Sequence, residues 1–235
     1  GAIRVGLRLQ NRDPLNLRLD EKQAAAALGQ IRLAEAYADS FAERDLNVGQ
    51  ILLTQEDTEN RRRYLNARAT LNRLLDWGTV PLVNENDTVA TAEIRFGDND
   101  RLAARVGGMV GADLLVLLSD IDGLYTSNPK ASAAAKHLPL VTSGITPEIE
   151  AMAGDETSAY AKGGMVTKLA AAKSARGAGC AMVIAGGRVL NPLQTLVDGA
   201  RATLFPSTET RHSAREAWLL GALSGDGALI LDDGA

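Results

Sequence analysis

The chain has little of several features that specialised proteins depend on. It contains one cysteine, Cys180, so no disulfide can form within it, and no apolar run is long enough to cross a bilayer. Its net charge of −4 gives no basic excess, so nucleic-acid binding is not expected of this domain. It also has no signal-peptide pattern. We therefore expect a cytoplasmic protein with no membrane contact, in which Cys180 is a buried strand residue.

Apolar residues are plentiful and are spaced in two alternating patterns. Hydrophobic residues make up 46% of the 235, enough for one large core. The helical spacing around residue 30 predicts a buried stripe that includes Leu28, Ile31 and Phe41. A short helix is predicted after Asn191, with Asn191 as N-cap and Pro192 in the first turn. The same patterns predict helices over 21–43, 64–75, 100–110 and 164–177, and strands over 50–54, 79–85, 113–120 and 180–187.

The segment 113–120, DLLVLLSD, is apolar over five consecutive residues. A strand with one face in water would alternate polar and apolar side chains, so both faces of this strand should be covered. Strands of this kind occur in parallel sheets between layers of helices. The predicted fold is α/β, a three-layer α/β/α sandwich around a largely parallel sheet.

Four polar motifs fall where predicted strands end or helices begin. They are NEND (84–87), GDND (97–100), SDIDG (119–123) and KGGMVTK (162–168). Ligands of parallel α/β sheets bind at the carboxyl ends of the strands, so the four loops would form one cleft. Taken singly, each motif also has a plain explanation, since Asn and Asp are ordinary turn and capping residues and Lys168 would usually be a solvated helix lysine.

In combination, these motifs favour phosphoryl transfer. Glycines before a helix leave free backbone N–H groups and a partial positive charge that suit a phosphate, and Lys168 adds a point charge in the first turn. Only His137 and His212 are present, and neither lies in these loops, so no histidine base is expected. A carboxylate acceptor needs no base because it is ionised at pH 7.

Three segments together carry a family resemblance: VNENDTVATAEIRFGDND, LLSDIDGLYTSNP and KGGMVTKLAAA. They resemble the glutamate 5-kinases of the amino acid kinase superfamily. The resemblance implies ATP and Mg²⁺ as cosubstrates and transfer of the γ-phosphoryl group to the side-chain carboxylate of L-glutamate, the first step of proline biosynthesis. It further implies proline as feedback inhibitor and a homo-oligomer.

The resemblance also implies a role for each matching position. Glutamate would be held by Asp87, Asn99 and Asn84, while Asp100 would orient the catalytic lysines and Lys168 would stabilise the transferring group. The nucleotide would meet Ser119, Asp120, Lys162, Gly163, Gly164, Met165, Thr167 and Lys168. No residue is assigned as a metal ligand.

The chain departs from the family pattern at its start. The family begins with a strand carrying Lys-x-Gly-Ser and a second ending in Ser-Gly-Ala, whereas this chain opens at Gly1-Ala2-Ile3. We therefore predict an N-terminally incomplete kinase domain over 1–220, with 221–235 as a linker or the start of a PUA-like domain. Two alternatives stay open: a related kinase acting on acetylglutamate, aspartate or UMP, and a noncatalytic amino-acid-binding regulatory module.

Overall fold

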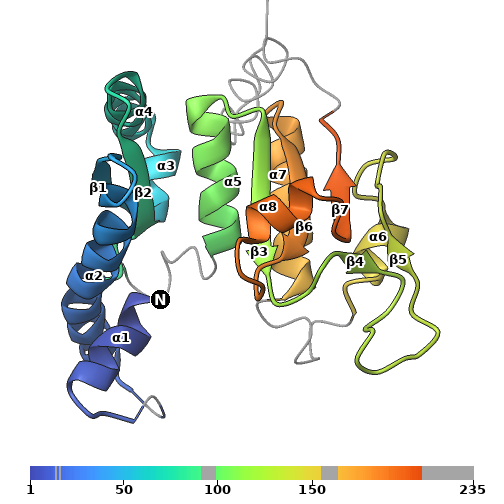
Figure 1. Cartoon of the computed structure of the whole chain (residues 1–235), viewed down its shortest axis with the longest axis horizontal. Coiled ribbons are helices and arrows are strands. Elements are labelled where there is room, and N and C mark those ends of the chain that lie inside the picture. The colour runs from blue at the N-terminus through green and yellow to red at the C-terminus, as the bar shows by residue number, and fades with distance from the viewer. Residues whose placement is uncertain (14, 16, 91–98, 155–163, 208–235) are drawn as a thin grey trace, which may run out of the picture.

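The computed structural model describes residues 1–13, 15, 17–90, 99–154 and 164–207. Helices and strands alternate along most of the chain (Figure 1). Within the described residues, no helix has both the length and the apolar character needed to span a membrane. The predicted boundary at residue 220 lies outside the described residues. The elements, in order, are α1 (Ala2–Leu9), α2 (Leu19–Ala42), β1 (Val48–Leu53), α3 (Gln55–Glu59), α4 (Arg61–Asp76), β2 (Val80–Glu85), α5 (Asn99–Val110), β3 (Leu114–Ser119), β4 (Leu124–Tyr125), β5 (His137–Leu138), α6 (Pro147–Ala151), α7 (Met165–Gly177), β6 (Ala181–Gly186), α8 (Pro192–Val197) and β7 (Ala202–Phe205).

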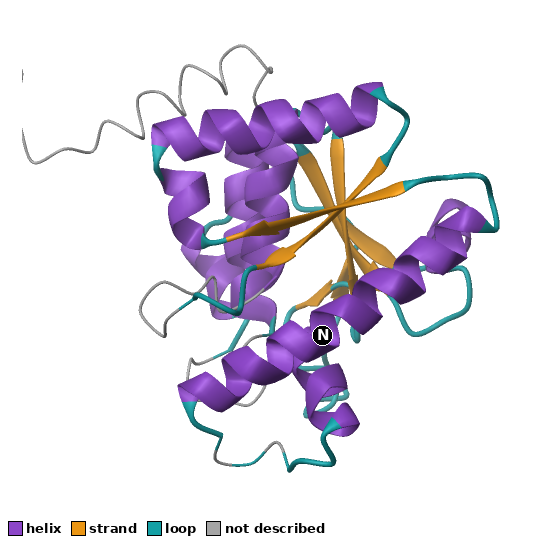
Figure 2. Cartoon of the chain, turned by 90° about the vertical axis from the view of Figure 1, so that its left-hand side faces the viewer, coloured by secondary structure: helices purple, strands orange, loops and turns teal. Residues whose placement is uncertain are grey.

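The strands form two main sheets and a short hairpin. Strands β1 and β2 are parallel, with Leu53 opposite Glu85. Strands β3 and β6 are also parallel, with Ser119 opposite Gly186, and β7 joins β6 in the antiparallel direction. Strands β4 and β5 form an antiparallel pair. Figure 2 shows the twist of the strands and the helices around them. The α/β prediction with largely parallel strands is confirmed.

Side chains at the helix starts explain several boundaries. The Thr54 hydroxyl accepts a hydrogen bond from the amide of Asp57, whose carboxylate accepts the Thr54 amide in return, so α3 begins with a capping box. The Asn60 side chain caps α4 by accepting from two backbone amides in the first turn. Asn191 precedes Pro192 at the start of α8, as predicted, although its side chain makes no capping bond.

The largest core lies around β6 and α7. Phe205, Met182 and Ile184 are fully buried there, and Ala171 and Ala172 place the helix backbone close to the sheet. Cys180 is buried immediately before β6, so its predicted place in the core is confirmed. The small side chains of α7 fix how closely the helix approaches the strands.

Helix α5 stands between the two main sheets (Figure 1). Leu102 packs with Leu53 of β1 in the smaller core, with Val106 partly buried beside them. Ala104 packs in the larger core around β6 and α7. Helix α5 therefore contributes to both cores. In the order of elements it comes after β2 and before β3.

The buried stripe predicted for the first long helix is wrong. Leu28 and Ile31 are exposed, and α2 instead buries Ala25, Gly29 and their neighbours against α1. The reason is close backbone contact, because the two helices meet where Gly6 faces Ala25 and Gly29 faces Ala2. Glycine and alanine allow this approach, whereas the larger apolar side chains point elsewhere.

The prediction that both faces of β3 are covered is also wrong. Leu117 is buried, but Leu114 and Leu118 are 48% and 45% exposed. Successive strand residues point to opposite faces. The face that carries Leu115 and Leu117 packs into the core beside α7, whereas on the other face α8 has only six residues and leaves Leu114 and Leu118 partly open.

Replacing Gly29 with alanine should destabilise the α1–α2 pair. A Cβ at this position would overlap the carbonyl of Ala2 and the amide nitrogen of Gly6, and backbone atoms cannot move aside as a side chain can. We expect a loss of about 1–3 kcal/mol in the free energy of unfolding. Chemical denaturation of Gly29→Ala measures it, with Gly177→Ala as control because a Cβ there meets no atom. Equal stability of both variants would contradict the close contact.

Candidate active site

Two helices bring Asp100 and Lys168 together. Asp100 lies in the first turn of α5 and Lys168 in the first turn of α7. The Lys168 Nζ donates a hydrogen bond to Asp100 Oδ2 at 2.8 Å, and the two side chains are only 11% and 16% exposed. The contact joins positions 68 residues apart. The structure thus confirms that GDND and KGGMVTK meet.

Thr167 is the third member of this group. Its hydroxyl oxygen lies 3.2 Å from Asp100 Oδ2 and 2.9 Å from the backbone carbonyl of Gly164. A hydroxyl carries one hydrogen, so Thr167 donates to one of these acceptors at a time or shares it between them. Asp100 therefore accepts a full hydrogen bond from Lys168 and at most a shared one from Thr167, and the Lys168 bond holds the carboxylate at the start of α7.

The first turn of α7 is well suited to an anion. The helix begins after Gly164, and no acidic residue occurs in its first turn. Its first backbone amides lack partners inside the helix, and the helix dipole adds partial positive charge. Met165 is buried in the core, so the group it offers here is its backbone amide. The bond to Asp100 occupies one of the three N–H bonds of the Lys168 ammonium, and the other two remain to bind an anion.

The order of elements places both helix starts at one edge of the sheet. Helix α5 leads into β3 and α7 leads into β6, each through a short turn, and the two strands are parallel. Both helices therefore run opposite to the strands, and their first turns lie near the strands' carboxyl ends. This is the edge at which parallel α/β sheets bind ligands.

Ser119 and Asp120 mark that edge on β3. Ser119 ends the strand, and its carbonyl accepts the amide of Gly187 at 2.7 Å. The Ser119 hydroxyl accepts the amide of Ile121 and lies 3.3 Å from Asp120 Oδ1. Asp120 is paired with Arg188 at 3.6 Å, with both side chains largely exposed. The structure therefore places these two residues on a loop at the end of β3.

The three residues expected to hold glutamate come from around the other sheet. Asn84 lies on β2, and its amide donates to Gln30 Oε1 of α2 at 2.8 Å. Asp87 is partly buried in the turn that follows β2, and Asn99 is exposed as the first residue of α5. Asn84 thus has a structural partner already, while Asn99 directly precedes Asp100. Lys162, Gly163 and Asp98 lie outside the described residues.

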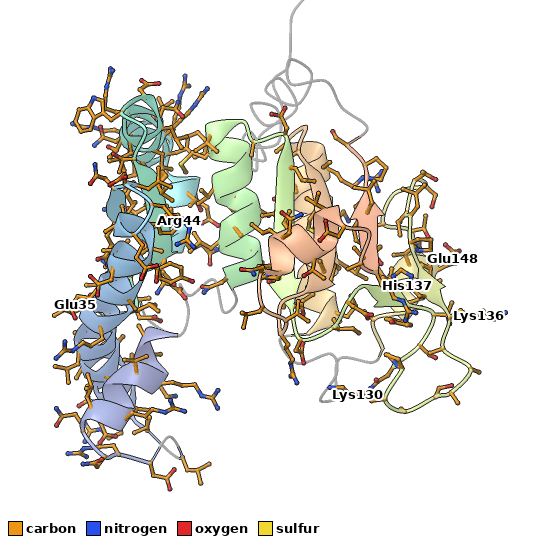
Figure 3. The ribbon with its side chains drawn as sticks, in the orientation of Figure 1. Glu35, Arg44, Lys130, Lys136, His137 and Glu148 are labelled. Atoms are coloured by element: carbon orange, nitrogen blue, oxygen red, sulfur yellow. The ribbon has the colours of Figure 1, made fainter. Side chains whose placement is uncertain are left out.

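A second polar group supports the SDIDG loop, and no motif in the sequence indicated it. Thr203 of β7 is fully buried, and its hydroxyl accepts the amide of Leu124 at 2.7 Å and donates to the carbonyl of Leu138 at 2.6 Å. His137 Nε2 lies 3.4 Å from the same oxygen, and this ring packs against Gly123. Figure 3 labels His137 beside the β4–β5 hairpin. His137 lies outside the polar loops in sequence, as predicted, but folding brings it against one of them.

Burial lowers the pKa of His137 from its ordinary value, and the nearby positive charge of Arg201 lowers it further. The ring is therefore neutral at pH 7. The rings of His137 and Tyr125 make an edge contact, with their centroids 5.2 Å apart. The Tyr125 hydroxyl donates to Asp122 at 2.7 Å and accepts from Arg201 at 3.1 Å. Asp122 of the loop is therefore bonded to Tyr125 of β4, which is bonded in turn to Arg201 just before β7.

Replacing Thr203 with valine should destabilise this region. Valine has a similar shape but no hydroxyl, so the amide of Leu124 and the carbonyl of Leu138 would lose their buried partner. We expect a loss of about 1–3 kcal/mol in the free energy of unfolding. Denaturant titration measures it, and hydrogen exchange at the Leu124 amide should quicken. Thr70→Val is the control, because the exposed Thr70 hydroxyl bonds only within its own helix. Equal stability of the two variants would show that Thr203 does not support the loop.

Comparisons with known proteins show the family of the chain. The model of the amino acid kinase family matches residues 4–186. The chain is 58% identical over its whole length to the glutamate 5-kinase of Paramagnetospirillum magneticum and 56% identical to that of Rhizobium rhizogenes. It covers 63% and 60% of these relatives, so it spans less than two thirds of their length. The predicted resemblance is confirmed.

Solved structures show the same fold at low sequence identity. A UMP kinase from Ureaplasma parvum superimposes with a TM-score of 0.52 at 13% identity, covering 84% of this chain and 74% of that one. An isopentenyl phosphate kinase from T. acidophilum gives a TM-score of 0.53 at 15% identity, covering 78% of this chain and 70% of that one. With most of its length matched by the family model and its fold shared with these kinases, the chain belongs to the amino acid kinase family.

Proposed function

We propose that this chain carries out the ATP-dependent phosphorylation of the γ-carboxylate of L-glutamate, the first step of proline biosynthesis. The observation that carries the proposal is the Lys168–Asp100 ion pair at the start of α7. It places a nearly buried cation beside the first backbone amides of a helix, an arrangement that stabilises a transferring phosphoryl group. The similarity to glutamate 5-kinases supports glutamate as the acceptor.

The residues of the site divide into four groups by role. Lys168 stabilises the negative charge that develops on the transferring group, and Asp100 holds the lysine in place through their 2.8 Å hydrogen bond. The backbone at Gly164 and Met165 and the hydroxyl of Thr167 receive the phosphates, together with Lys162 and Gly163. Ser119 and Asp120 contact the nucleotide from the end of β3. Asp87, Asn99 and Asn84 bind glutamate.

The reaction needs no general base. The γ-carboxylate of glutamate is ionised at pH 7, and one of its oxygens attacks the γ-phosphorus of ATP. The bond from that phosphorus to the bridging oxygen breaks, the electron pair leaves with ADP, and γ-glutamyl phosphate forms. The neutral His137 belongs to the support of the SDIDG loop and takes no proton in this scheme.

The donor set at the start of α7 fits ATP with Mg²⁺. Mg²⁺ is usually held by substrate phosphates, water and one or two carboxylates rather than by a cage of protein ligands. When bound, it would neutralise part of the phosphate charge. We place it on the phosphates rather than on Asp100, since Asp100 is already paired with Lys168.

The similarity to glutamate 5-kinases supports the rest of the assignment. We propose a cytoplasmic enzyme that is inhibited by proline at the glutamate site and works as a homo-oligomer. Two other functions compete with this proposal: a related kinase for acetylglutamate, aspartate or UMP, and a noncatalytic amino-acid-binding module.

Replacing Lys168 with alanine should lower kcat by on the order of 10² or more, because charge stabilisation in the transition state is lost. Asp100→Asn should also lower kcat, since the amide no longer pairs with the ammonium. Steady-state kinetics measure both. Lys173→Ala is the control, because Lys173 is exposed on the same helix. Unchanged turnover in Lys168→Ala, with its fold intact by circular dichroism, would make Lys168 an ordinary helix lysine.

Hydroxylamine trapping tests the reaction itself. An acyl phosphate reacts with hydroxylamine, so γ-glutamyl phosphate should appear as a hydroxamate that requires L-glutamate, ATP and Mg²⁺ and decreases when proline is added. Faster hydroxamate formation from aspartate, or faster ATP turnover with acetylglutamate or UMP, would assign a different substrate. Binding of glutamate or proline by calorimetry, without ATP binding or hydroxamate, would instead support the noncatalytic module.

A further inference from the structure

A groove of about 220 Å³ lies on the outside of α5 and α7. Among the described residues, it is lined by Arg101 and Arg105 of α5, Ala170 and Ser174 of α7, and Gln55 at the start of α3. Arg101 follows Asp100 in sequence, but the two have different surroundings. Asp100 faces Lys168 in the candidate active site, whereas Arg101 is exposed along the groove.

Helix geometry explains why a groove forms here. Residues four apart lie one above the other on the same face of a helix, so Arg101 and Arg105 form one wall and Ala170 and Ser174 the facing wall. The arginine side chains are long, and the opposing side chains are small. Large side chains on both helices would fill the space between them. Because Ala170 and Ser174 are small, the groove stays open beside Arg101 and Arg105.

The charge of the groove is poorly balanced within the protein. Two like charges four residues apart on a helix destabilise it by about 0.2–0.5 kcal/mol. Glu59 lies 3.8 Å from Arg105, with both side chains about half exposed, and its Oε1 also accepts a hydrogen bond from Gln55 at 2.7 Å. In the described part of the chain, Arg101 has no ion-pair or hydrogen-bond partner. The groove therefore carries local positive charge on a protein whose net charge is −4.

We propose that this groove binds the phosphate group of a small anion. Two guanidinium groups match phosphate oxygens in charge and geometry, since each can donate two parallel N–H bonds. The Ser174 hydroxyl and the Gln55 amide add neutral donors on the other sides. A bound phosphate would bridge α5 and α7, the two helices whose first turns carry Asp100 and Lys168. The site is separate from that pair and does not rest on the proposed function.

Calorimetry with inorganic phosphate tests the proposal on the whole protein. Phosphate replaces chloride during the titration so that the ionic strength stays constant. Under these conditions we expect saturable phosphate binding with a Kd on the order of 1 mM. Arg101→Gln should weaken binding by at least about tenfold, because a charge-assisted hydrogen bond is lost, and Ser174→Ala should weaken it by about threefold. Arg62→Gln is the matched control. Arg62 is an exposed arginine on α4 that does not line the groove.

The candidate active site also offers a phosphate position, so the same titration is run in Lys168→Ala. In Lys168→Ala, phosphate should still bind to the groove with unchanged affinity, and it should raise the melting temperature of this variant. Binding that is lost in Lys168→Ala but retained in Arg101→Gln would place phosphate at the active site and overturn the proposal. If Arg62→Gln weakens phosphate binding as much as Arg101→Gln does, the binding reflects general surface charge and the proposal is wrong. If no binding is detected up to about 50 mM phosphate, the Kd is far weaker than 1 mM and the site is excluded.

Discussion

The position of α5 between two cores is the constraint on which the rest of the structure depends. Leu102 packs toward β1 and Ala104 toward β6 and α7, so the helix cannot turn or slide without opening one core or the other. Asp100 lies within about one turn of these anchors, so the position of its backbone opposite Lys168 is fixed by the packing of the helix. The phosphate groove uses the solvent-facing side of the same helix, where Arg101 and Arg105 point away from both cores.

The Lys168–Asp100 pair combines two requirements that usually conflict. A lysine that stabilises a phosphoryl group must keep its charge, yet an isolated ammonium is costly to bury. Asp100 compensates for the burial, and the bond from Thr167 helps to hold the carboxylate in place. The ammonium is thus held in one direction while part of its donor capacity is left for a ligand. Such preorganisation lowers the cost of rearrangement when charge develops in the transition state.

The sequence predicted the main strands and helices because these depend on local patterns, whereas the contact of Asp100 with Lys168, 68 residues apart, was expected only from the family resemblance. Spacing located the strand at Leu114–Ser119 and the helix at Met165–Gly177, and the glycines with Lys168 indicated phosphate chemistry. It failed where long-range packing decides. Leu28 and Ile31 fit a helical stripe, but the α1–α2 contact through Gly29 turned a different face inward. The group around Thr203 was missed for the same reason, since no spacing in a single sequence links residue 124 to residue 203. The roles of Asp87, Asn99 and Asn84 rest on resemblance and stay predictions.

The hydrogen bond from Leu124 to Thr203 has a consequence for the protein during its synthesis. Its two ends lie 79 residues apart, so the loop after β3 leaves the ribosome long before β7 exists. At about 5–20 residues per second, this interval lasts on the order of 4–16 seconds. For most of that time β3 cannot pair with β6 either, because β6 ends only at Gly186. The apolar segment LLVLL therefore stays in the nascent chain with this edge unpaired, and an unpaired apolar strand is prone to aggregate until its partner has been made.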